Sequence, residues 1–159
     1  MAVKNSNPVG KRRTSRSAAP TGRQSSKPAV VRAANSMTVL QLTEAIRDGL
    51  PASELVALKE ALGASNEQMA RFIGTSTATL NRRRDGGRLT AVEGDRVVRF
   101  ARLYGLALEV MGTPEHARAW LASAQRGLGG ATPLEHALTE LGAREVEELL
   151  GRIEHGVYS

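Results

Sequence analysis

The chain has no cysteine and very few aromatic residues, and these absences exclude several classes of protein. Without cysteine there are no disulfide bonds or thiolate metal sites, and nothing requires an oxidising compartment, so we expect a cytoplasmic protein. Aromatic residues make up 3% of the chain, which limits the core that 159 residues can build. No run of about 18 apolar residues occurs, and the N-terminus lacks the apolar region of a secretory signal. We therefore expect a small helical core and no membrane partner.

Groups of residues that could carry out catalysis are also missing. The three histidines, His116, His136 and His155, are too far apart in the chain for two of them to share one helix face around a metal. The chain has no G-x-S-x-G turn and no glycine loop between a strand and a helix that could hold phosphate. We expect no metal, no cofactor and no enzymatic activity.

Charge is divided unevenly along the chain. Residues 1–36 carry eight Lys and Arg and no acid, and they are rich in Ser, Pro and Gly, which predicts a disordered basic tail. An arm on nucleic acid is the favoured role for this tail, and the alternative is that translation begins at Met37. Residues 71–102 hold eight Arg against three acids, whereas residues 103–159 hold four Arg against eight Glu. Only the middle segment has the charge to seek phosphate.

Apolar periodicity predicts an all-α fold with no strand. The first four expected helices run from residue 38 to a stop at Gly49, from Pro51 to Gly63, from a Ser65 to Gln68 capping box to Gly74, and from Ser76 or Thr75 to about Arg84. A long helix is expected over residues 90–111, and another begins at Pro114. A closing pair is expected over residues 133–141 and 143–153, with Gly142 between them. In the long helix one arc is apolar: Val97, Phe100, Ala101, Tyr104, Ala107, Leu108 and Met111. The opposite arc carries Arg96, Arg99 and Arg102. In the helix that begins at Pro114, the side chain of Trp120 is expected in the core.

Residues 66–84 have the spacing of a helix-turn-helix. Ala70 suits the helix crossing, Gly74 lies in the turn, and Leu80 is the apolar anchor of the second helix. The candidate DNA-contacting residues of that second helix are Ser76, Thr77, Thr79, Asn81, Arg82, Arg83 and Arg84. Hydroxyls and N–H groups suit phosphate, whereas Asn81 and Arg82 are suited to adenine and guanine edges.

Some features of this segment leave its function open. Arg83 stands where a second apolar anchor is usual, so the Arg82 to Arg84 run could lie along the phosphate backbone. The alternative is an ordinary helical hairpin with a solvated basic end. A larger phosphate footprint would include Arg88, Arg96, Arg99 and Arg102.

The carboxyl end has the composition of a binding segment. Its candidate partner-contacting residues are Arg152, Glu154, His155, Gly156, Val157, Tyr158 and Ser159. Tyr158 offers a large contact area at low entropy cost, and the Ser159 carboxylate adds a charge. The alternative is that residues 156–159 only fray. The acids Glu135, Glu140, Glu145, Glu147 and Glu148 either complement a basic partner or form a solvated face.

Several short motifs in the C-terminal half resemble a known family. They are Ala119-Trp120-Leu121, Leu128-Gly129-Gly130, Thr132-Pro133-Leu134, Thr139 with Gly142-Ala143, and the stretch from Leu150 to Ser159. Over about residues 40–159 the chain resembles the bacterial Xre/MbcA/ParS-type antitoxins that accompany RES-domain toxins. The resemblance implies a helix-turn-helix domain (37–111) and a small helical toxin-binding domain (112–159) after the tail.

The resemblance also implies a function. Such antitoxins repress their own operon and neutralise an NAD-consuming or ADP-ribosylating RES toxin, with the C-terminus in the toxin's active site. The implied partners are a cognate RES-domain toxin and operator DNA, with the chain as a homodimer and in hetero-oligomers with the toxin. Two alternatives stay open: a stand-alone helix-turn-helix regulator whose C-terminal domain only dimerises, and an adaptor that binds a protein while Arg82 to Arg84 remain in solvent.

Overall fold

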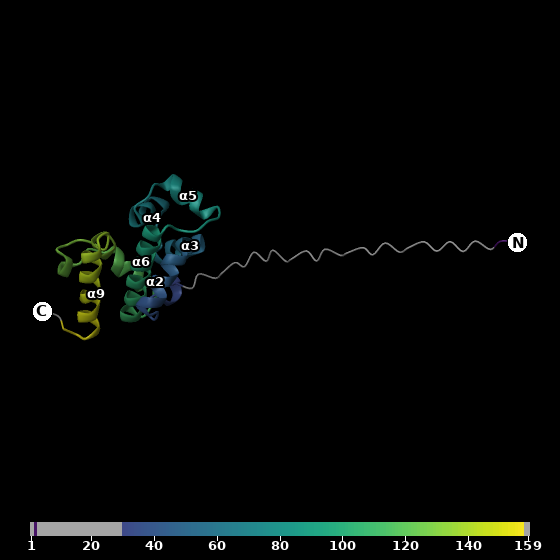
Figure 1. Ribbon diagram of the computed structural model, residues 1–159. Coiled ribbons are helices and arrows are strands. Elements are labelled where there is room, and N and C mark those ends of the chain that lie inside the picture. The colour runs from purple at the N-terminus through teal and green to yellow at the C-terminus, as the bar shows by residue number, and fades with distance from the viewer. Residues whose placement is uncertain (1, 3–29, 158–159) are drawn as a thin grey trace.

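The longest helix, α6 (Ala91–Met111), lies at the centre of the molecule and is contacted by most of the other helices (Figure 1). The computed structural model describes residue 2 and residues 30–157. The other elements in that range are α1 (Val30–Ala33), α2 (Val39–Asp48), α3 (Ala52–Leu62), α4 (Asn66–Ile73), α5 (Thr77–Arg84), α7 (Pro114–Ala122), the 3-10 turn η1 (Arg126–Leu128), α8 (Pro133–His136) and α9 (Glu140–Glu154). No strand occurs among these residues, which confirms the all-α expectation.

The predicted apolar arc of α6 forms the centre of the core. Val97, Phe100, Ala101 and Ala107 are fully buried, and Tyr104 is nearly so. The Phe72 ring of α4 lies 4.9 Å from the Phe100 ring, centroid to centroid, so the core joins the helix-turn-helix to α6. The expectation for Trp120 holds only in part, because this side chain is half-buried at the edge of the core.

Side-chain caps fix where the helices start. Thr38, Ser65 and Thr90 each accept a hydrogen bond from the backbone three residues on, and the Gln or Glu at that position reaches back to the cap N–H. Ser76 caps α5 through a hydrogen bond from Thr79 N–H to its Oγ (3.1 Å). The predicted starts of these helices are confirmed, because a capping residue satisfies N–H groups that have no partner within the helix.

The prediction that residues 1–36 form one disordered tail is wrong for residues 30–36. Val30, Val31 and Ala34 are buried in the core, and residues 30–33 form α1. The sequence argument failed here because a four-residue apolar segment is too short to show periodicity. The rest of the predicted tail, residue 2 apart, lies outside the described residues.

The predicted boundary inside the closing helical pair is also wrong. Gly142 does not end a helix: α8 stops at His136, and α9 begins at Glu140 with Thr139 as its cap. A Cβ on Gly142 would lie 1.8 Å from the His136 carbonyl oxygen. The glycine is needed for this close approach between α8 and α9.

None of the helices in the described range is long and apolar enough to cross a lipid bilayer.

Candidate functional site

Helices α4 and α5 and the turn between them have the geometry of a helix-turn-helix. Ala70 and Leu80 are buried where the sequence placed the crossing and the anchor. Gly74 has a φ of 68° and ends α4 in the left-handed region that favours glycine. Arg96 of α6 donates a hydrogen bond from Nη1 to the Ile73 carbonyl at the end of α4 (2.6 Å). This hydrogen bond attaches the turn to the central helix.

The solvent face of α5 carries most of the candidate DNA-contacting residues. Ser76, Thr77, Asn81, Arg82 and Arg84 are exposed and Thr79 is half-buried, on the side away from Leu80. The hydrogen bonds that Arg82 and Arg84 donate to their own helix are long, 3.5 Å each, and solvent-exposed. These guanidinium groups can leave such weak contacts for phosphate or base edges.

Arg83 is separated from this group. Its Nε lies 3.2 Å from Oε2 of Glu93, a largely buried carboxylate in the first turn of α6. The same carboxylate accepts a hydrogen bond from Thr90 N–H (2.8 Å). Arg83 stands where a second apolar anchor is usual, and it holds α5 to α6 through this ion pair.

The arginines of the possible larger phosphate footprint have partners within the chain. Arg88 donates to the carbonyls of Asp48 (2.8 Å) and Gly49 (2.6 Å) at the end of α2. Arg96, Arg99 and Arg102 are likewise held by protein partners. A sequence shows that a helix has a basic face, but it does not show which acids and carbonyls fold onto that face.

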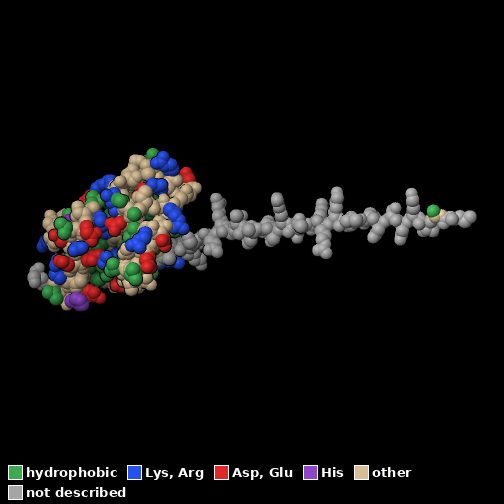
Figure 2. Space-filling view, in the orientation of Figure 1, with side chains coloured by type: hydrophobic (Ala, Val, Ile, Leu, Met, Phe, Trp, Pro, Cys, Tyr) green, Lys and Arg blue, Asp and Glu red, His purple; other side chains and the backbone are tan. Residues whose placement is uncertain are grey.

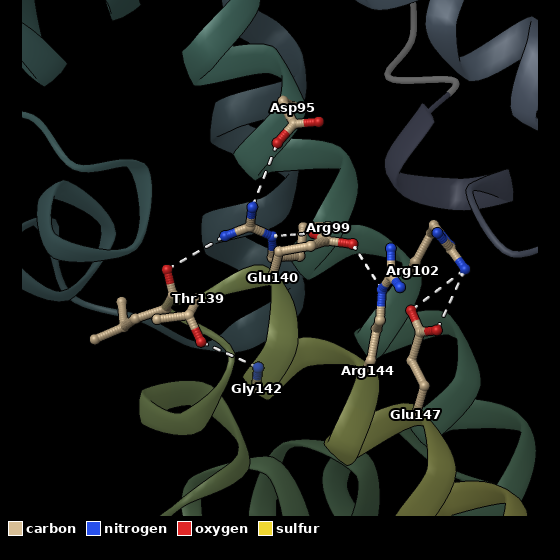
Figure 3. A network of polar contacts seen from close by, with 9 residues as sticks. Asp95, Arg99, Arg102, Thr139, Glu140, Gly142, Arg144 and Glu147 are labelled. Carbon is tan, nitrogen blue, oxygen red and sulfur yellow. Dashed lines mark hydrogen bonds and ion pairs between the residues drawn. The ribbon is translucent and has the colours of Figure 1, made fainter.

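Arg99 is the centre of the network that attaches α9 to α6 (Figure 3). Its side chain is 13% exposed, and it contacts Glu140 (Nε to Oε2, 3.2 Å), Asp95 (Nη2 to Oδ2, 3.4 Å) and the Leu138 carbonyl (Nη1 to O, 3.3 Å). One helical turn further along, Arg102 pairs with Glu147 (3.3 Å). Two ion pairs and a backbone contact therefore set the orientation of α9.

Most of the candidate partner-contacting residues lie on the surface at the end of α9. Gly156 N–H donates to the Ile153 carbonyl (3.1 Å), and Val157 N–H donates to the Arg152 carbonyl (2.9 Å), which closes the helix in a Schellman motif. Arg152, Glu154, His155 and Gly156 are exposed, and Val157 is 56% exposed. These candidates lie together, whereas Tyr158 and Ser159 lie outside the described residues.

The acidic residues of the C-terminal region are mostly paired within the chain. Glu135 contacts Arg71 (3.7 Å), Glu145 contacts His136, and Glu140 and Glu147 belong to the Arg99 and Arg102 pairs. Figure 2 shows acidic side chains mixed with Lys and Arg side chains over the α9 side, and further Lys and Arg side chains at the α5 end. Most of these acids therefore pair with basic side chains of the same chain. Glu148 is exposed, and within the described residues it forms none of the ion pairs that the structure shows.

Sequence reasoning missed the contacts that join the two halves. Arg118 of α7 donates to the carbonyls of Ala61 (2.7 Å) and Glu60 (3.2 Å) at the end of α3, and the Arg71 contact with Glu135 joins α4 to α8. No local sequence pattern predicts a contact between segments that lie about 60 residues apart in the chain. Among residues 2 and 30–157, no three His, Asp or Glu side chains are grouped to hold a metal ion.

Two family models match nearly the whole folded part. The antitoxin Xre-like helix-turn-helix domain matches residues 41–102, and the antitoxin Xre/MbcA/ParS C-terminal toxin-binding domain matches residues 106–156. The two matched regions meet inside α6.

Known proteins show the same similarity. Proteins called antitoxin Xre from Yersinia enterocolitica and Photorhabdus laumondii are 32% and 33% identical to the chain over 120 residues, which cover 74% of this chain and 81% of each relative. A further antitoxin Xre, from Pseudomonas putida, is 32% identical over 70% of this chain and 69% of its own length. A solved chain of the M. tuberculosis MbcT-MbcA toxin-antitoxin complex has a similar fold, with a TM-score of 0.55 at 20% identity over 69% of this chain and 98% of that one.

Proposed function

The chain belongs to the Xre antitoxin family, and we propose that it neutralises a cognate RES-domain toxin by placing its last residues in the toxin's active site. The toxin would consume NAD or transfer ADP-ribose from it. The observation that supports this most is the carboxyl end of α9. This helix is fixed on α6 by the Arg99 network, and its closing motif leaves Val157, the last residue that the structure describes, 56% exposed.

An active-site plug needs a rigid base and a short segment that can be buried in the partner. The ion pairs of Arg99 and Arg102 supply the base, and the Schellman closure at Gly156 fixes the direction in which the chain leaves α9. Val157, Tyr158 and Ser159 would then fill the partner's pocket. The aromatic ring gives a large contact area, and its hydroxyl gives a group for hydrogen bonding.

We further propose that α5 lies in the major groove of operator DNA and represses the chain's own operon. Thr77, Asn81 and Arg82 on the exposed face would contact the duplex, with the first N–H groups of α5 directed at phosphate. A homodimer, free or assembled with toxin, would place two α5 helices on two half-sites. Arg83 serves the fold in this arrangement.

Coexpression with the cognate RES-domain toxin tests the plug. A chain that ends at His155 is expected to lose protection, so cell growth and NAD level fall, while the full chain preserves both. Immunoblots of both chains control for abundance. If the shortened chain still protects growth and NAD, the plug is rejected and the toxin is neutralised by another surface of the chain. If the full chain itself fails to protect, a stand-alone regulator becomes the better account.

A promoter reporter tests repression separately. Replacing Asn81 and Arg82 by Ala is expected to relieve repression and relax base preference, since a bidentate contact contributes roughly 1–3 kcal/mol of discrimination. The double variant should still protect cells from the toxin. An unchanged footprint on operator DNA would move sequence readout away from α5.

A further inference from the structure

A cavity of about 590 Å³ lies where α1, α3, α6 and α7 meet. Cavities of this size that lie between parts of a fold, with an apolar wall and a few polar groups, are the usual sites for small molecules. The apolar side chains used below are Ala57 of α3 and Leu108 of α6, and the polar ones are Arg32 of α1, Glu60 of α3, Tyr104 of α6 and Arg118 of α7.

No role for this cavity follows from the family to which the chain belongs. Helix α1 precedes residue 41, where the helix-turn-helix match begins. Tyr104 and Gly105 fall between the two matched regions, which end at residue 102 and begin again at residue 106. Part of the cavity wall therefore comes from residues that neither family model includes.

The α1 wall of the cavity is held in place by the fold. Glu54 of α3, which is 3% exposed, accepts hydrogen bonds from the backbone N–H groups of Val30 (3.1 Å) and Val31 (3.0 Å). These N–H groups belong to the first turn of α1, where no partner exists within the helix. At the other end of the segment, Asn35 packs so closely on Gly105 that a Cβ there would lie 2.9 Å from Asn35 Cγ.

Tyr104 brings a free hydroxyl to this cavity. The residue is 9% exposed, yet its hydroxyl forms none of the hydrogen bonds that the structure shows within the described residues. A tyrosine that is buried to this extent usually gives its hydroxyl a partner. In the same range, the side-chain atom that is fully buried without a partner is Asn66 Oδ1, so the Tyr104 hydroxyl is within reach of solvent. It can donate one hydrogen bond to a ligand and accept others.

The cavity also carries free charges of both signs. The guanidinium of Arg118 is fixed by hydrogen bonds to two backbone carbonyls at the end of α3 (2.7 and 3.2 Å), and its Nη1 takes no part in them. The guanidinium of Arg32 and the carboxylate of Glu60 form none of the ion pairs shown for the part of the chain that the structure describes. The other acid of the lining, Glu109, is contacted by Asn35.

We propose that this cavity binds a small zwitterion with an apolar body, of the size of an apolar dipeptide. The carboxylate of the ligand contacts Arg118 and accepts a hydrogen bond from the Tyr104 hydroxyl, its ammonium group contacts Glu60, and its side chains pack on Ala57 and Leu108. A simple anion would leave the acid unneutralised, and a simple cation would leave the guanidinium groups so. Charge complementarity therefore favours a ligand that carries both signs.

Isothermal titration calorimetry with the full chain tests the site. The probe is leucyl-leucine, and its matched control is acetyl-leucyl-leucine amide, which has the same side chains but neither charge. Tyr104→Phe removes only the hydroxyl, and Glu60→Gln removes the proposed partner of the ammonium group. Tyr158→Phe changes the second of the two tyrosines and serves as the control variant. Thermal unfolding verifies that each variant keeps the fold.

The full chain should bind leucyl-leucine at least about tenfold more tightly than the blocked peptide. Tyr104→Phe and Glu60→Gln should each weaken binding by about tenfold, because each removes a hydrogen bond to a charged group of the ligand, whereas Tyr158→Phe should bind like the unchanged chain. The absence of binding up to about 10 mM, or equal binding of the blocked peptide, would overturn the proposal. So would unchanged affinity in both test variants, or tighter binding of AMP than of the dipeptide. None of these outcomes depends on toxin or operator binding.

Discussion

At the scale of single residues, the same side-chain type serves two purposes within three positions of α5. Arg82 and Arg84 are exposed and make only weak contacts to their own helix, whereas Arg83 pairs with the largely buried Glu93. A buried carboxylate that loses its cation keeps its desolvation cost, so the two kinds of arginine should differ in what their removal changes. Exposed cations should affect binding, and Arg83 should affect stability.

Replacing Arg83 by Ala should lower the free energy of unfolding by about 1 kcal/mol, a modest loss because the pair is partly solvent-exposed. The matched change, Arg84→Ala, removes an exposed arginine one position away and should leave stability within about 0.5 kcal/mol. Urea unfolding followed by circular dichroism measures both. Equal effects of the two changes would show that the pair with Glu93 does not stabilise α5.

At the scale of helices, local sequence signals predicted where most elements begin and failed where a long-range contact decides. The Ser65 to Gln68 capping box correctly predicted the start of α4, because a cap acts within three residues of itself. Apolar periodicity placed the starts of α2 and α6 at residues 38 and 90, where the structure has the caps Thr38 and Thr90. Arg99 pairs with Glu140, 41 residues further along the chain, and no local pattern in the sequence indicates this contact. The solvent face of α5 was predicted because it follows from the position of Leu80 alone. No pattern in the sequence predicts that the Glu54 carboxylate accepts hydrogen bonds from the backbone N–H groups of Val30 and Val31 at the start of α1.

Glycines in α9 test the corrected boundary between α8 and α9. Gly142→Ala should destabilise the fold by about 1–3 kcal/mol, because the new Cβ would meet the backbone carbonyl of His136 and not a flexible side chain. Gly151 lies in the same helix, and a Cβ there would meet nothing within 4 Å. Gly151→Ala should therefore be neutral or stabilise by about 0.5–1 kcal/mol. Similar Tm values for both variants would mean that the close approach of α8 is not needed.

Deleting α1 tests whether it belongs to the folded domain. A chain that starts at Met37 should unfold with a free energy about 2–4 kcal/mol lower than a chain that starts near residue 29, since it loses the burial of Val30 and Val31 and the hydrogen bonds to Glu54. Differential scanning calorimetry of the two shortened chains makes the comparison without the basic residues of segment 1–28 in either. Identical Tm values would show that α1 is dispensable.

At the scale of the whole molecule, two surfaces share one central helix. The first turn of α6 holds α5 through Glu93 and Arg83, and Arg96 one turn on holds the turn before α5. The following turns of α6 hold α9 through Arg99 and Arg102. Figure 1 shows α5 and the end of α9 at opposite ends of the molecule. In the proposed function, this arrangement would let one chain hold DNA at one end and a toxin at the other without competition for the same side chains.

The central claim is that the carboxyl end of α9 closes the toxin's active site, and NAD consumption by the purified toxin tests it most directly. The toxin would be titrated with the full chain and with a chain that ends at His155, while size-exclusion chromatography reports whether each complex forms. The account predicts that the full chain stops NAD consumption at an equimolar ratio, and that the shortened chain still binds the toxin but leaves it active. Equal inhibition by both chains would contradict the account.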